Sequence, residues 1–329
     1  MTTLRCLGCY ELLADSPDSR YHPVCSRRLF GRSVPPKLDV RTAQLEQLGR
    51  QLVQHREAVT GVQPKLSLGL RRGRDADRLT LLTQHGSGDF ILKPPFDRYP
   101  HLPEVEDLTM HLAADAGLRV AAHGLIRLTP DEGNPLVDAP GPLAYLTRRF
   151  DRPGKGARLA MEDMAQLSGK LAVYKYHGSL EQIGKVIAKY SSFPGQDALE
   201  FFQLAVFCFL TGNADMHLKN FSLLTQPDGT VRLSPAYDLV ATKLVNPADD
   251  EDTALTLNGR KKRLKPADFA ALANSLRIPF PAVRNAYAGL QKQESKWRQR
   301  ITSSFLPDEQ KEQYQALLTE RLARLALSE

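Results

Sequence analysis

The sequence predicts an α+β protein of two lobes, with strands concentrated in the first half and helices in the second. The chain has 329 residues, which is more than one typical hydrophobic core encloses and which suits two packed lobes. Short apolar runs bounded by turn residues precede residue 95, and a long apolar helix candidate lies near residue 200. We therefore divide the chain into a small N-terminal segment, 1–35, a first lobe, 36–150, and a second lobe, 151–329.

Three short strands are expected early in the first lobe, at residues 65–70, 79–82 and 90–93. Each is a short apolar run, and Pro94-Pro95 stops the third. A fourth strand is expected at residues 143–150.

Two helices are expected in the same lobe. The first covers about residues 39–55, because Leu45, Leu48 and Leu52 recur at helical spacing on one face. The second opens at Pro103 and runs to about residue 116, where Gly117 ends it.

The second lobe is expected to be mainly helical, with helices at residues 162–171, 180–190 and 198–210. The third of these is apolar nearly all round, which is typical of a helix at the centre of a lobe. A hairpin is expected around Pro227-Asp228-Gly229, and helices return from about residue 266. Cys208 should pack in the core, and Trp297 has no assignable function.

Composition places weaker limits on the location and the partners of the protein. Apolar residues make up 42% of the chain, but no apolar run reaches the length of a membrane span, so a cytoplasmic protein without a membrane partner is expected. The net charge of +7 favours acidic partners without choosing among them. The basic run at residues 260–265 either contacts phosphate or is a solvated loop.

The densest group of polar residues follows the apolar helix of the second lobe. Asp215 and Asn220 are five residues apart, and phosphoryl transfer uses a carboxylate near the attacking hydroxyl and a short oxygen ligand for the metal at this spacing. Lys219 could neutralise charge on the transferred group. Taken alone, the pair is also compatible with a polar turn. His217, between them, either acts as an acid or base or holds the loop through hydrogen bonds.

A further acidic residue follows the predicted hairpin. Asp238 lies 18 residues after Asn220. Since Mg²⁺ prefers hard oxygen ligands and takes few of them from protein, Asn220 and Asp238 would suffice to hold it. An ordinary Asp in a turn is the alternative.

A lysine ends the third strand of the first lobe. Burial of a lysine requires a partner, so Lys93 either contacts phosphate, with Glu106 of the following helix as its partner, or points into water. A stretch with Gly61, Gln63 and Lys65 precedes this strand where a kinase carries a phosphate-covering loop, although by itself it reads as a hairpin.

The order of these parts is more specific than any one of them, and it predicts a bilobal protein-kinase-like fold that uses ATP and Mg²⁺. Two alternatives stay open. One is a kinase-like regulatory binding module without catalysis, which the retention of Lys93, Asp215, Asn220 and Asp238 disfavours. The other is a small-molecule kinase on the same fold.

The N-terminal segment contains a separate pattern. Cys6 and Cys9 are followed after twelve residues by His22 and Cys25. Two short pairs of thiol and imidazole ligands form a plausible tetrahedral set for a structural Zn²⁺, which would substitute for a core that so small a segment cannot form. Three buried cysteines without metal are the alternative.

At these motifs the chain resembles the HipA family of bacterial toxin kinases, over roughly residues 58–239. The resemblance rests on several stretches in order: Gly61-Val62-Gln63-Pro64-Lys65, Ile91-Leu92-Lys93-Pro94, Leu102-Pro103-Glu104-Val105-Glu106, Arg149-Phe150-Asp151-Arg152, Glu162-Asp163-Met164, Gly212-Asn213-Ala214-Asp215-Met216-His217-Leu218-Lys219-Asn220-Phe221 and Ser234-Pro235-Ala236-Tyr237-Asp238. The chain looks most like the short HipT-type toxin of three-gene systems, in which a separate small protein supplies the missing N-terminal subdomain.

The resemblance implies a serine/threonine protein kinase with Asp215 as the catalytic residue. It further implies Asn220 and Asp238 as Mg²⁺ ligands, and Lys93 with Glu106 at the ATP phosphates. The implied substrate is a translation component such as an aminoacyl-tRNA synthetase. The implied partner is an antitoxin, through which alone the toxin would contact DNA.

Such toxins also phosphorylate a serine just before the Gly-x-Gln-x-Lys stretch, which expels that loop and stops ATP binding. This chain has Ala58-Val59-Thr60 where the short toxins have Ser-x-Ser. Thr60 is therefore the first candidate acceptor for autophosphorylation, and Ser67 is the second.

Overall fold

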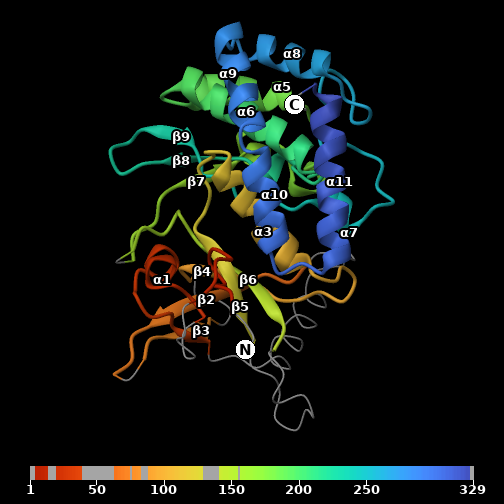
Figure 1. The fold of residues 1–329 in the computed structure, drawn as a ribbon. Helices are drawn as coiled ribbons and strands as arrows, with labels where there is room; N and C mark the ends of the chain where they lie inside the picture. The colour runs from red at the N-terminus through yellow and green to blue at the C-terminus, as the bar shows by residue number, and fades with distance from the viewer. Residues whose placement is uncertain are drawn as a thin grey trace. The chain divides into compact units, whose positions relative to one another are not determined.

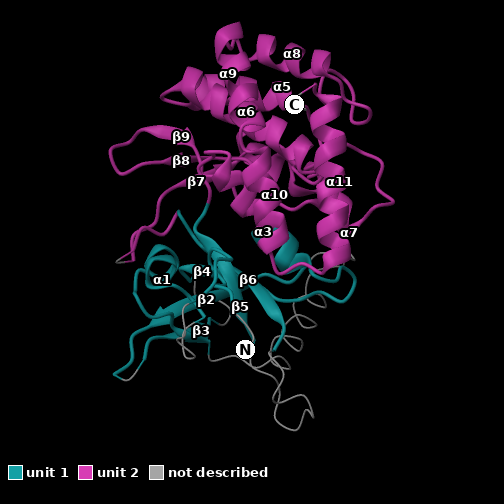
Figure 2. Ribbon diagram, viewed as in Figure 1, with its two compact units in different colours: residues 1–107, 121–150 teal, residues 108–120, 151–329 magenta. Residues whose placement is uncertain are grey.

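The structure is a computed structural model that describes residues 4–13, 20–38, 63–74, 76–82, 88–128, 141–154 and 156–326. The chain forms two compact units (Figure 2): unit 1 comprises residues 1–107 and 121–150, and unit 2 comprises residues 108–120 and 151–329. Among the described helices, none combines the length and the apolar character that crossing a membrane requires.

Unit 1 is built on a six-stranded sheet with the order β1-β3-β2-β4-β6-β5 (Figure 1). Its pairings are antiparallel except for β1 with β3. The strands are β1 (Lys37–Leu38), β2 (Leu66–Arg71), β3 (Arg78–Leu81), β4 (Phe90–Lys93), β5 (His123–Arg127) and β6 (Leu143–Arg148).

The four strands predicted in this unit are confirmed, as β2, β3, β4 and β6. The strand β5, which forms one edge of the sheet, was not predicted. Four of its five residues are buried, so the strand lacks the alternation of apolar and polar residues that marks a half-buried strand. The helix predicted at residues 39–55 lies outside the described residues.

Two helices accompany this sheet. The first, α1 (Pro23–Phe30), lies within the cysteine-containing segment, where no helix was predicted. It begins with a proline and ends at Gly31, whose φ of 73° is the left-handed conformation that terminates helices. The second, α3 (Leu102–Asp115), confirms the helix predicted from Pro103 and continues into unit 2 at residue 108.

The core of unit 2 surrounds α6 (Pro194–Leu210). Phe201, Phe202 and Phe207 are fully buried, which confirms the prediction of a central helix. Phe207 packs edge-on against Trp297 with ring centroids 5.9 Å apart. Trp297 is itself fully buried and donates a hydrogen bond to the Leu112 carbonyl, so its role is structural. Cys208 is buried in this core, as predicted.

The other elements of unit 2 are a three-stranded sheet and further helices around α6 (Figure 1). The strands are β7 (Met161–Asp163), β8 (Ser222–Thr225) and β9 (Val231–Leu233), and β8 and β9 form the predicted hairpin. The helices are α4 (Met164–Leu167), α5 (Leu180–Tyr190), α7 (Thr242–Val245), α8 (Pro266–Ser275), α9 (Phe280–Gln291), α10 (Glu294–Ser303) and α11 (Asp308–Arg324), with 3₁₀ turns η1 (Ala172–Tyr174) and η2 (Leu218–Asn220).

The helix predicted at residues 162–171 is confirmed only in part, as α4, because its first residues lie in β7 and it ends earlier than predicted. Glu162 pairs with Leu223 across the β7–β8 ladder, so the chain is extended there. Asp163 then caps the short helix α4: its carboxylate accepts from the Gln166 amide, and the Gln166 side chain accepts from the Asp163 amide. This capping box starts the helix two residues later than the hydrophobic pattern indicated, and α4 ends at Leu167.

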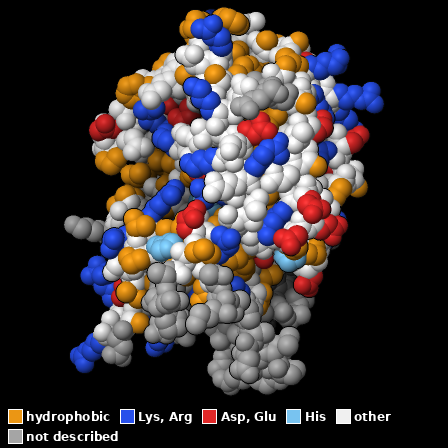
Figure 3. All heavy atoms as spheres, viewed as in Figure 1, with side chains coloured by type: hydrophobic (Ala, Val, Ile, Leu, Met, Phe, Trp, Pro, Cys, Tyr) orange, Lys and Arg blue, Asp and Glu red, His pale blue; other side chains and the backbone are white. Residues whose placement is uncertain are grey.

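The basic surface of unit 2 is partly neutralised. Within the run at residues 260–265, Lys262 lies 2.5 Å from an Asp250 carboxylate oxygen, and Lys261 lies 3.5 Å from Glu251. Figure 3 shows lysine and arginine side chains interspersed with acidic ones on the face that it presents. This distribution agrees better with a solvated loop than with a phosphate-binding stripe.

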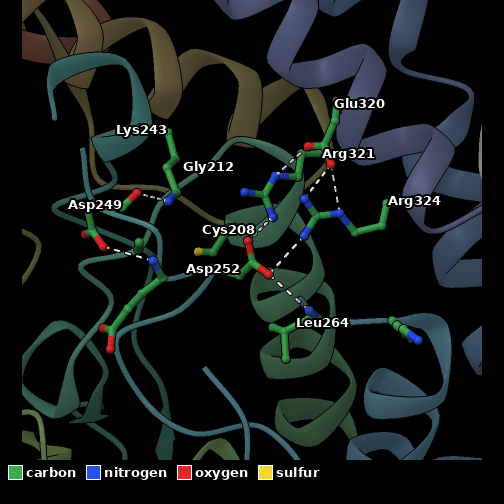
Figure 4. Close-up of polar contacts among 12 residues, drawn as sticks. Cys208, Gly212, Lys243, Asp249, Asp252, Leu264, Glu320, Arg321 and Arg324 are labelled. Atoms are coloured by element: carbon green, nitrogen blue, oxygen red, sulfur yellow. Dashed lines mark hydrogen bonds and ion pairs between the residues drawn. The ribbon is translucent and has the colours of Figure 1, made fainter. Parts of the chain in front are cut away.

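The last helix of unit 2 is tied to the loop before α8 by one carboxylate. Asp252 lies 2.5 Å from Arg321 Nη1 and 2.9 Å from Arg324 Nη1, and it accepts the Leu264 backbone amide at 3.0 Å (Figure 4). Asp252 and Arg321 are both buried. Burial alone would raise the Asp252 pKa, but the hydrogen bond from Leu264 and the two guanidinium groups lower it below its ordinary value.

We expect Asp252→Asn to lower the free energy of unfolding by about 1.5–3 kcal/mol at neutral pH, since it removes charge-assisted hydrogen bonds to a buried arginine. The native pKa is depressed, so this stabilisation is present above the unfolded-state pKa of about 3.9 and is lost as pH falls through the native pKa. Urea unfolding at pH 7 and below pH 4 should therefore show the difference between wild type and variant shrinking in acid. Asp250→Asn, at an exposed position in the same loop, is the matched control and should change little. A difference independent of pH would contradict this account.

Candidate functional site

Two of the predicted site residues form a buried ion pair in unit 1. Lys93 ends β4, and its ammonium lies 2.5 Å from Glu106 Oε1 on α3. Lys93 is 4% exposed and Glu106 is fully buried. The ammonium also lies 5.4 Å from the centre of the Tyr145 ring, on the paired strand β6. A lysine this deeply buried needs a countercharge close to it. Glu106 supplies that charge, and the contact is compatible with a structural role or with a role in chemistry.

The predicted phosphate-covering stretch is described only in part. Thr60 and Gly61 lie outside the described residues. The Gln63 side chain donates a hydrogen bond of 3.0 Å to the Pro94 carbonyl, next to Lys93 in the chain. Lys65 is exposed. Ser67 lies in β2, and its hydroxyl accepts the Gly88 amide at 2.8 Å.

The predicted catalytic loop follows α6 in unit 2 and is fixed by its backbone. Gly212 has a φ of 67°, and a Cβ there would approach the Leu317 side chain at 2.7 Å, so the position favours glycine. The Thr242 hydroxyl accepts the Ala214 amide at 2.8 Å and donates to the Gly212 carbonyl at 3.2 Å. These contacts hold the chain that leads into Asp215.

Asp215 is an exposed residue on this rigid loop. Its backbone amide donates to Asn213 Oδ1 at 3.2 Å, and the Tyr176 hydroxyl donates to its carboxylate at 2.8 Å. Asn220, at the end of η2, donates its amide nitrogen to the Asp215 carbonyl at 3.1 Å. That bond leaves the Asn220 amide oxygen as the atom that can bind a cation.

Asp238 lies beyond the hairpin and has a φ of 59°. Left-handed backbone is unfavourable for a residue other than glycine and is concentrated at functional sites. The preceding residue, Tyr237, contacts the Ser222 hydroxyl at 2.6 Å and donates to the Lys219 carbonyl at 2.9 Å. Asp238 is therefore held next to the same loop by its neighbour.

The pKa of His217 depends on burial and on the charged residues around it. Burial lowers its pKa below the ordinary value for histidine; the carboxylates of Asp215 and Asp238 act against this shift, and Lys175 adds to it. Both carboxylates are thus within electrostatic range of one imidazole. The ring packs edge-on to Tyr176 at 5.1 Å, and its lowered pKa favours the neutral form at pH 7.

Lys219 is exposed, and its ammonium lies 3.5 Å from Asp163 Oδ2 at the cap of α4. Its predicted role in neutralising a phosphoryl group stays a prediction, as do the roles of the other residues in this group.

Sequence reasoning missed three residues that shape this group: Tyr176, which contacts the Asp215 carboxylate, Thr242, which holds the loop, and Asp163, which pairs with Lys219. For Tyr176 the sequence offers only the pattern Tyr174-Lys175-Tyr176, which does not by itself point to the Asp215 carboxylate. Thr242 gave no signal either.

The four predicted zinc ligands come together in unit 1. The thiol sulfurs of Cys6, Cys9 and Cys25 and a ring nitrogen of His22 all lie within 4.8 Å of one another. The four residues therefore form a candidate metal centre, separate from the groups described above.

Comparison with known proteins agrees with the motifs. The model of the HipA-like C-terminal domain matches residues 58–297. The provisionally named kinase Y4dM of Sinorhizobium fredii is 36% identical over 213 residues, which are 64% of this chain and 50% of that protein. The serine/threonine-protein kinase toxin HipA of Shewanella oneidensis is 30% identical over 211 residues, 57% of this chain and 44% of its own. The chain thus spans about half the length of the curated relatives it matches.

Two solved structures share the fold. A chain of the Shewanella oneidensis toxin–antitoxin complex of HipA, HipB and operator DNA matches with a TM-score of 0.63 and 23% identity, over 85% of this chain and 71% of that one. The Helicobacter pylori proinflammatory kinase CtkA matches with a TM-score of 0.50 and 14% identity, over 79% and 93%. These likenesses confirm the predicted α+β, kinase-like fold. Because the family model covers well over half of its residues, this chain belongs to the family of the HipA-like C-terminal domain.

Proposed function

We propose that this chain is an ATP- and Mg²⁺-dependent serine/threonine protein kinase of the HipA type. The observation that carries the proposal is the loop of unit 2, in which Asp215 is exposed, Asn220 donates to the Asp215 carbonyl, and Tyr237, the neighbour of Asp238, donates to the Lys219 carbonyl. Kinases of this fold use an Asp and an Asn at this spacing, followed by a metal-binding Asp.

The donor set fits Mg²⁺. The Asn220 amide oxygen and the Asp238 carboxylate are hard oxygen ligands of the kind that Mg²⁺ prefers. When bound, Mg²⁺-ATP supplies the phosphoryl group and neutralises the charge that develops on it. Asn220 and Asp238 are the residues that would hold the ion.

Lys93 is assigned to the ATP phosphates, with Glu106 orienting its ammonium. The buried pair holds a positive charge at a fixed point at the end of β4, as phosphate binding by a strand lysine requires. Gln63 and Lys65 are assigned to the loop over the phosphates, together with Gly61. Segments 36–150 and 151–329 then serve as ATP-binding and catalytic lobes.

Asp215 is assigned as the catalytic carboxylate. It would accept the proton of the attacking serine or threonine hydroxyl, and Tyr176 would hold one of its oxygens so that the other faces the acceptor. Lys219 is assigned to charge neutralisation at the same step.

The names of the relatives support part of a biological setting for this activity. The Shewanella oneidensis HipA is named as a kinase toxin, and its solved complex contains HipB and operator DNA. We assign this chain a bacterial protein substrate, with an aminoacyl-tRNA synthetase as the first candidate. An antitoxin would hold it in check and provide the only contact with DNA. The HipT-type subclass, its small partner protein, and autophosphorylation at Thr60 or Ser67 belong to the same proposal.

The proposal is tested by incubating the purified chain with γ-labelled ATP, Mg²⁺ and bacterial lysate. We expect label in protein, and we expect Asp238→Asn to lower its rate by about 100-fold, because one charged ligand is lost from a site that stabilises developing charge. Asp228→Asn, in the exposed turn between β8 and β9, is the matched control and should be neutral.

Three other outcomes would overturn the proposal. Label in small metabolites rather than in protein would favour a small-molecule kinase. Binding of ATP without transfer would favour a regulatory binding module. Equal rates for Asp238→Asn and Asp228→Asn would remove Asp238 from the site.

A further inference from the structure

The N-terminal segment of unit 1 has a cluster of metal-binding side chains that the proposed kinase function does not use. The ligand atoms of Cys6, Cys9, His22 and Cys25 lie within 4.8 Å of one another. In a tetrahedral zinc site, metal–ligand lengths of about 2.3 Å for sulfur and about 2.0–2.1 Å for nitrogen place neighbouring ligand atoms roughly 3.3–3.8 Å apart. Cys9 Sγ and His22 Nδ1 are 3.3 Å apart. The cluster therefore has nearly the dimensions of a zinc site.

The hydrogen bonds around the cluster favour the His22 tautomer and the Cys6 thiolate that can bind a metal. His22 Nε2 lies 3.1 Å from the Leu12 carbonyl; since a carbonyl only accepts, Nε2 carries the proton and Nδ1 presents its lone pair towards the thiols. The backbone amides of Gly8 and His22 donate to Cys6 Sγ at 3.4 and 3.3 Å. A sulfur that accepts two amide hydrogen bonds is typical of a thiolate that binds metal.

The loop that carries two of these ligands lies along the edge strand of the sheet. The Leu125 amide of β5 donates to the Leu7 carbonyl at 3.0 Å, and the Tyr21 hydroxyl donates to the Leu125 carbonyl. Gly124 admits this approach, because a Cβ there would lie 2.7 Å from the Tyr21 hydroxyl. The segment thus covers an edge strand that would otherwise expose unpaired backbone groups.

The same loop reaches α3 through Tyr10, the residue after the ligand Cys9. The Tyr10 hydroxyl donates to Asp107 Oδ2 at 2.6 Å, and the other oxygen of Asp107 lies 2.7 Å from His123 Nδ1 of β5. Tyr10 is fully buried and has a φ of 70°. A tyrosine in left-handed backbone needs its surroundings to hold it there, and the turn closed by the Tyr10 amide on the Cys6 carbonyl does so.

We propose that Cys6, Cys9, His22 and Cys25 bind one structural Zn²⁺, and that this metal fixes the N-terminal segment onto the edge of the unit 1 sheet and onto α3. All four coordination positions are filled by protein, so the site is closed and structural rather than catalytic. The described residues of the segment bury few large side chains, chiefly Tyr10, Tyr21, Leu29 and Phe30, and a metal supplies the stability that so small a core lacks.

Metal analysis of the full chain, purified under reducing conditions without chelator, tests the first half of the proposal. We expect about one zinc per chain, since four protein ligands complete one tetrahedral site. His22→Ala should weaken zinc binding by at least about 100-fold, whereas His22→Cys should retain the metal as a four-thiolate site. Cys208→Ala, which removes the one cysteine outside the cluster, is the matched control and should keep its zinc.

Hydrogen exchange on the wild-type chain tests the second half without relying on any variant that fails to fold. Removal of zinc by a chelator should raise amide exchange in residues 4–13 and also in β5, where the Leu125 amide bonds to Leu7. Readdition of zinc should reverse both changes.

Reduced chain that binds no zinc when it is supplied, or loss of zinc in Cys208→Ala as readily as in His22→Ala, would overturn the metal site. Faster exchange in residues 4–13 with β5 unchanged would overturn the attachment to the sheet. Neither readout depends on ATP turnover, so this proposal and the kinase proposal can fail separately.

Discussion

Asp215→Asn is expected to lower phosphoryl transfer by about 1,000-fold, within the range that a positioned general base contributes. The amide of asparagine cannot accept the proton of the attacking hydroxyl, and it carries no charge that would favour the transferring group. The exposed position of Asp215 makes the change compatible with the fold, and the Tyr176 hydroxyl can still donate to an amide oxygen. Single-turnover transfer from labelled ATP measures the effect.

Tyr176→Phe is the companion variant for this experiment. It removes the hydroxyl that holds one oxygen of Asp215 but leaves the carboxylate itself, so we expect a loss of about 10-fold, as for the removal of one hydrogen bond to a charged group. Thermal unfolding should be similar in wild type and both variants. If Asp215→Asn transfers phosphate at the wild-type rate, Asp215 is not the catalytic carboxylate, whatever its position in the loop.

The sequence predicted those parts of the fold whose signal is local. The apolar run before residue 211 could only be a buried helix, and Pro94-Pro95 stops β4 where the pattern indicated. The strand β5 was missed because it is buried on both faces and so lacks alternation. The strand β7 was mistaken for helix because its pairing with β8 depends on residues about 60 positions later in the chain. Such pairings are invisible to a window of neighbouring residues.

The same distinction holds for the candidate site. The spacing of Asp215 and Asn220 is visible in the sequence because one loop supplies both. The contact of Tyr176 with Asp215 is not visible, since it joins residues 39 positions apart. The left-handed backbone of Asp238 was also not predictable, because Asp adopts that conformation more often than most residues but still at only a small share of its positions.

The ion pair of Lys93 and Glu106 was predictable from the sequence, but its role was not. A lysine that ends an apolar strand needs a countercharge, and the next helix offered one. The structure places the two side chains in contact and buries both. Burial of this kind explains why the pair is present but not what it does, since a buried pair contributes little net stability compared with apolar replacements. A role in ATP binding and a purely structural role therefore predict different outcomes when the pair is removed together.

Lys93→Met alone is expected to lower the free energy of unfolding by about 3–5 kcal/mol, because it removes the cation that contacts the fully buried Glu106 carboxylate. The double variant Lys93→Met/Glu106→Gln should recover most of this loss in urea unfolding, since both charges of the pair are then removed. ATP turnover should stay at least about 100-fold below wild type in the double variant, because neither new side chain attracts phosphate.

As a matched control, the surface pair Arg119 and Glu200, changed to Met and Gln, should show a coupling of at most about 1 kcal/mol and normal turnover. Recovery of both stability and turnover in the double variant would show that the pair is structural, and the phosphate lysine would then have to be sought elsewhere. Recovery of stability alone would separate the two roles and assign the ammonium of Lys93 to the nucleotide.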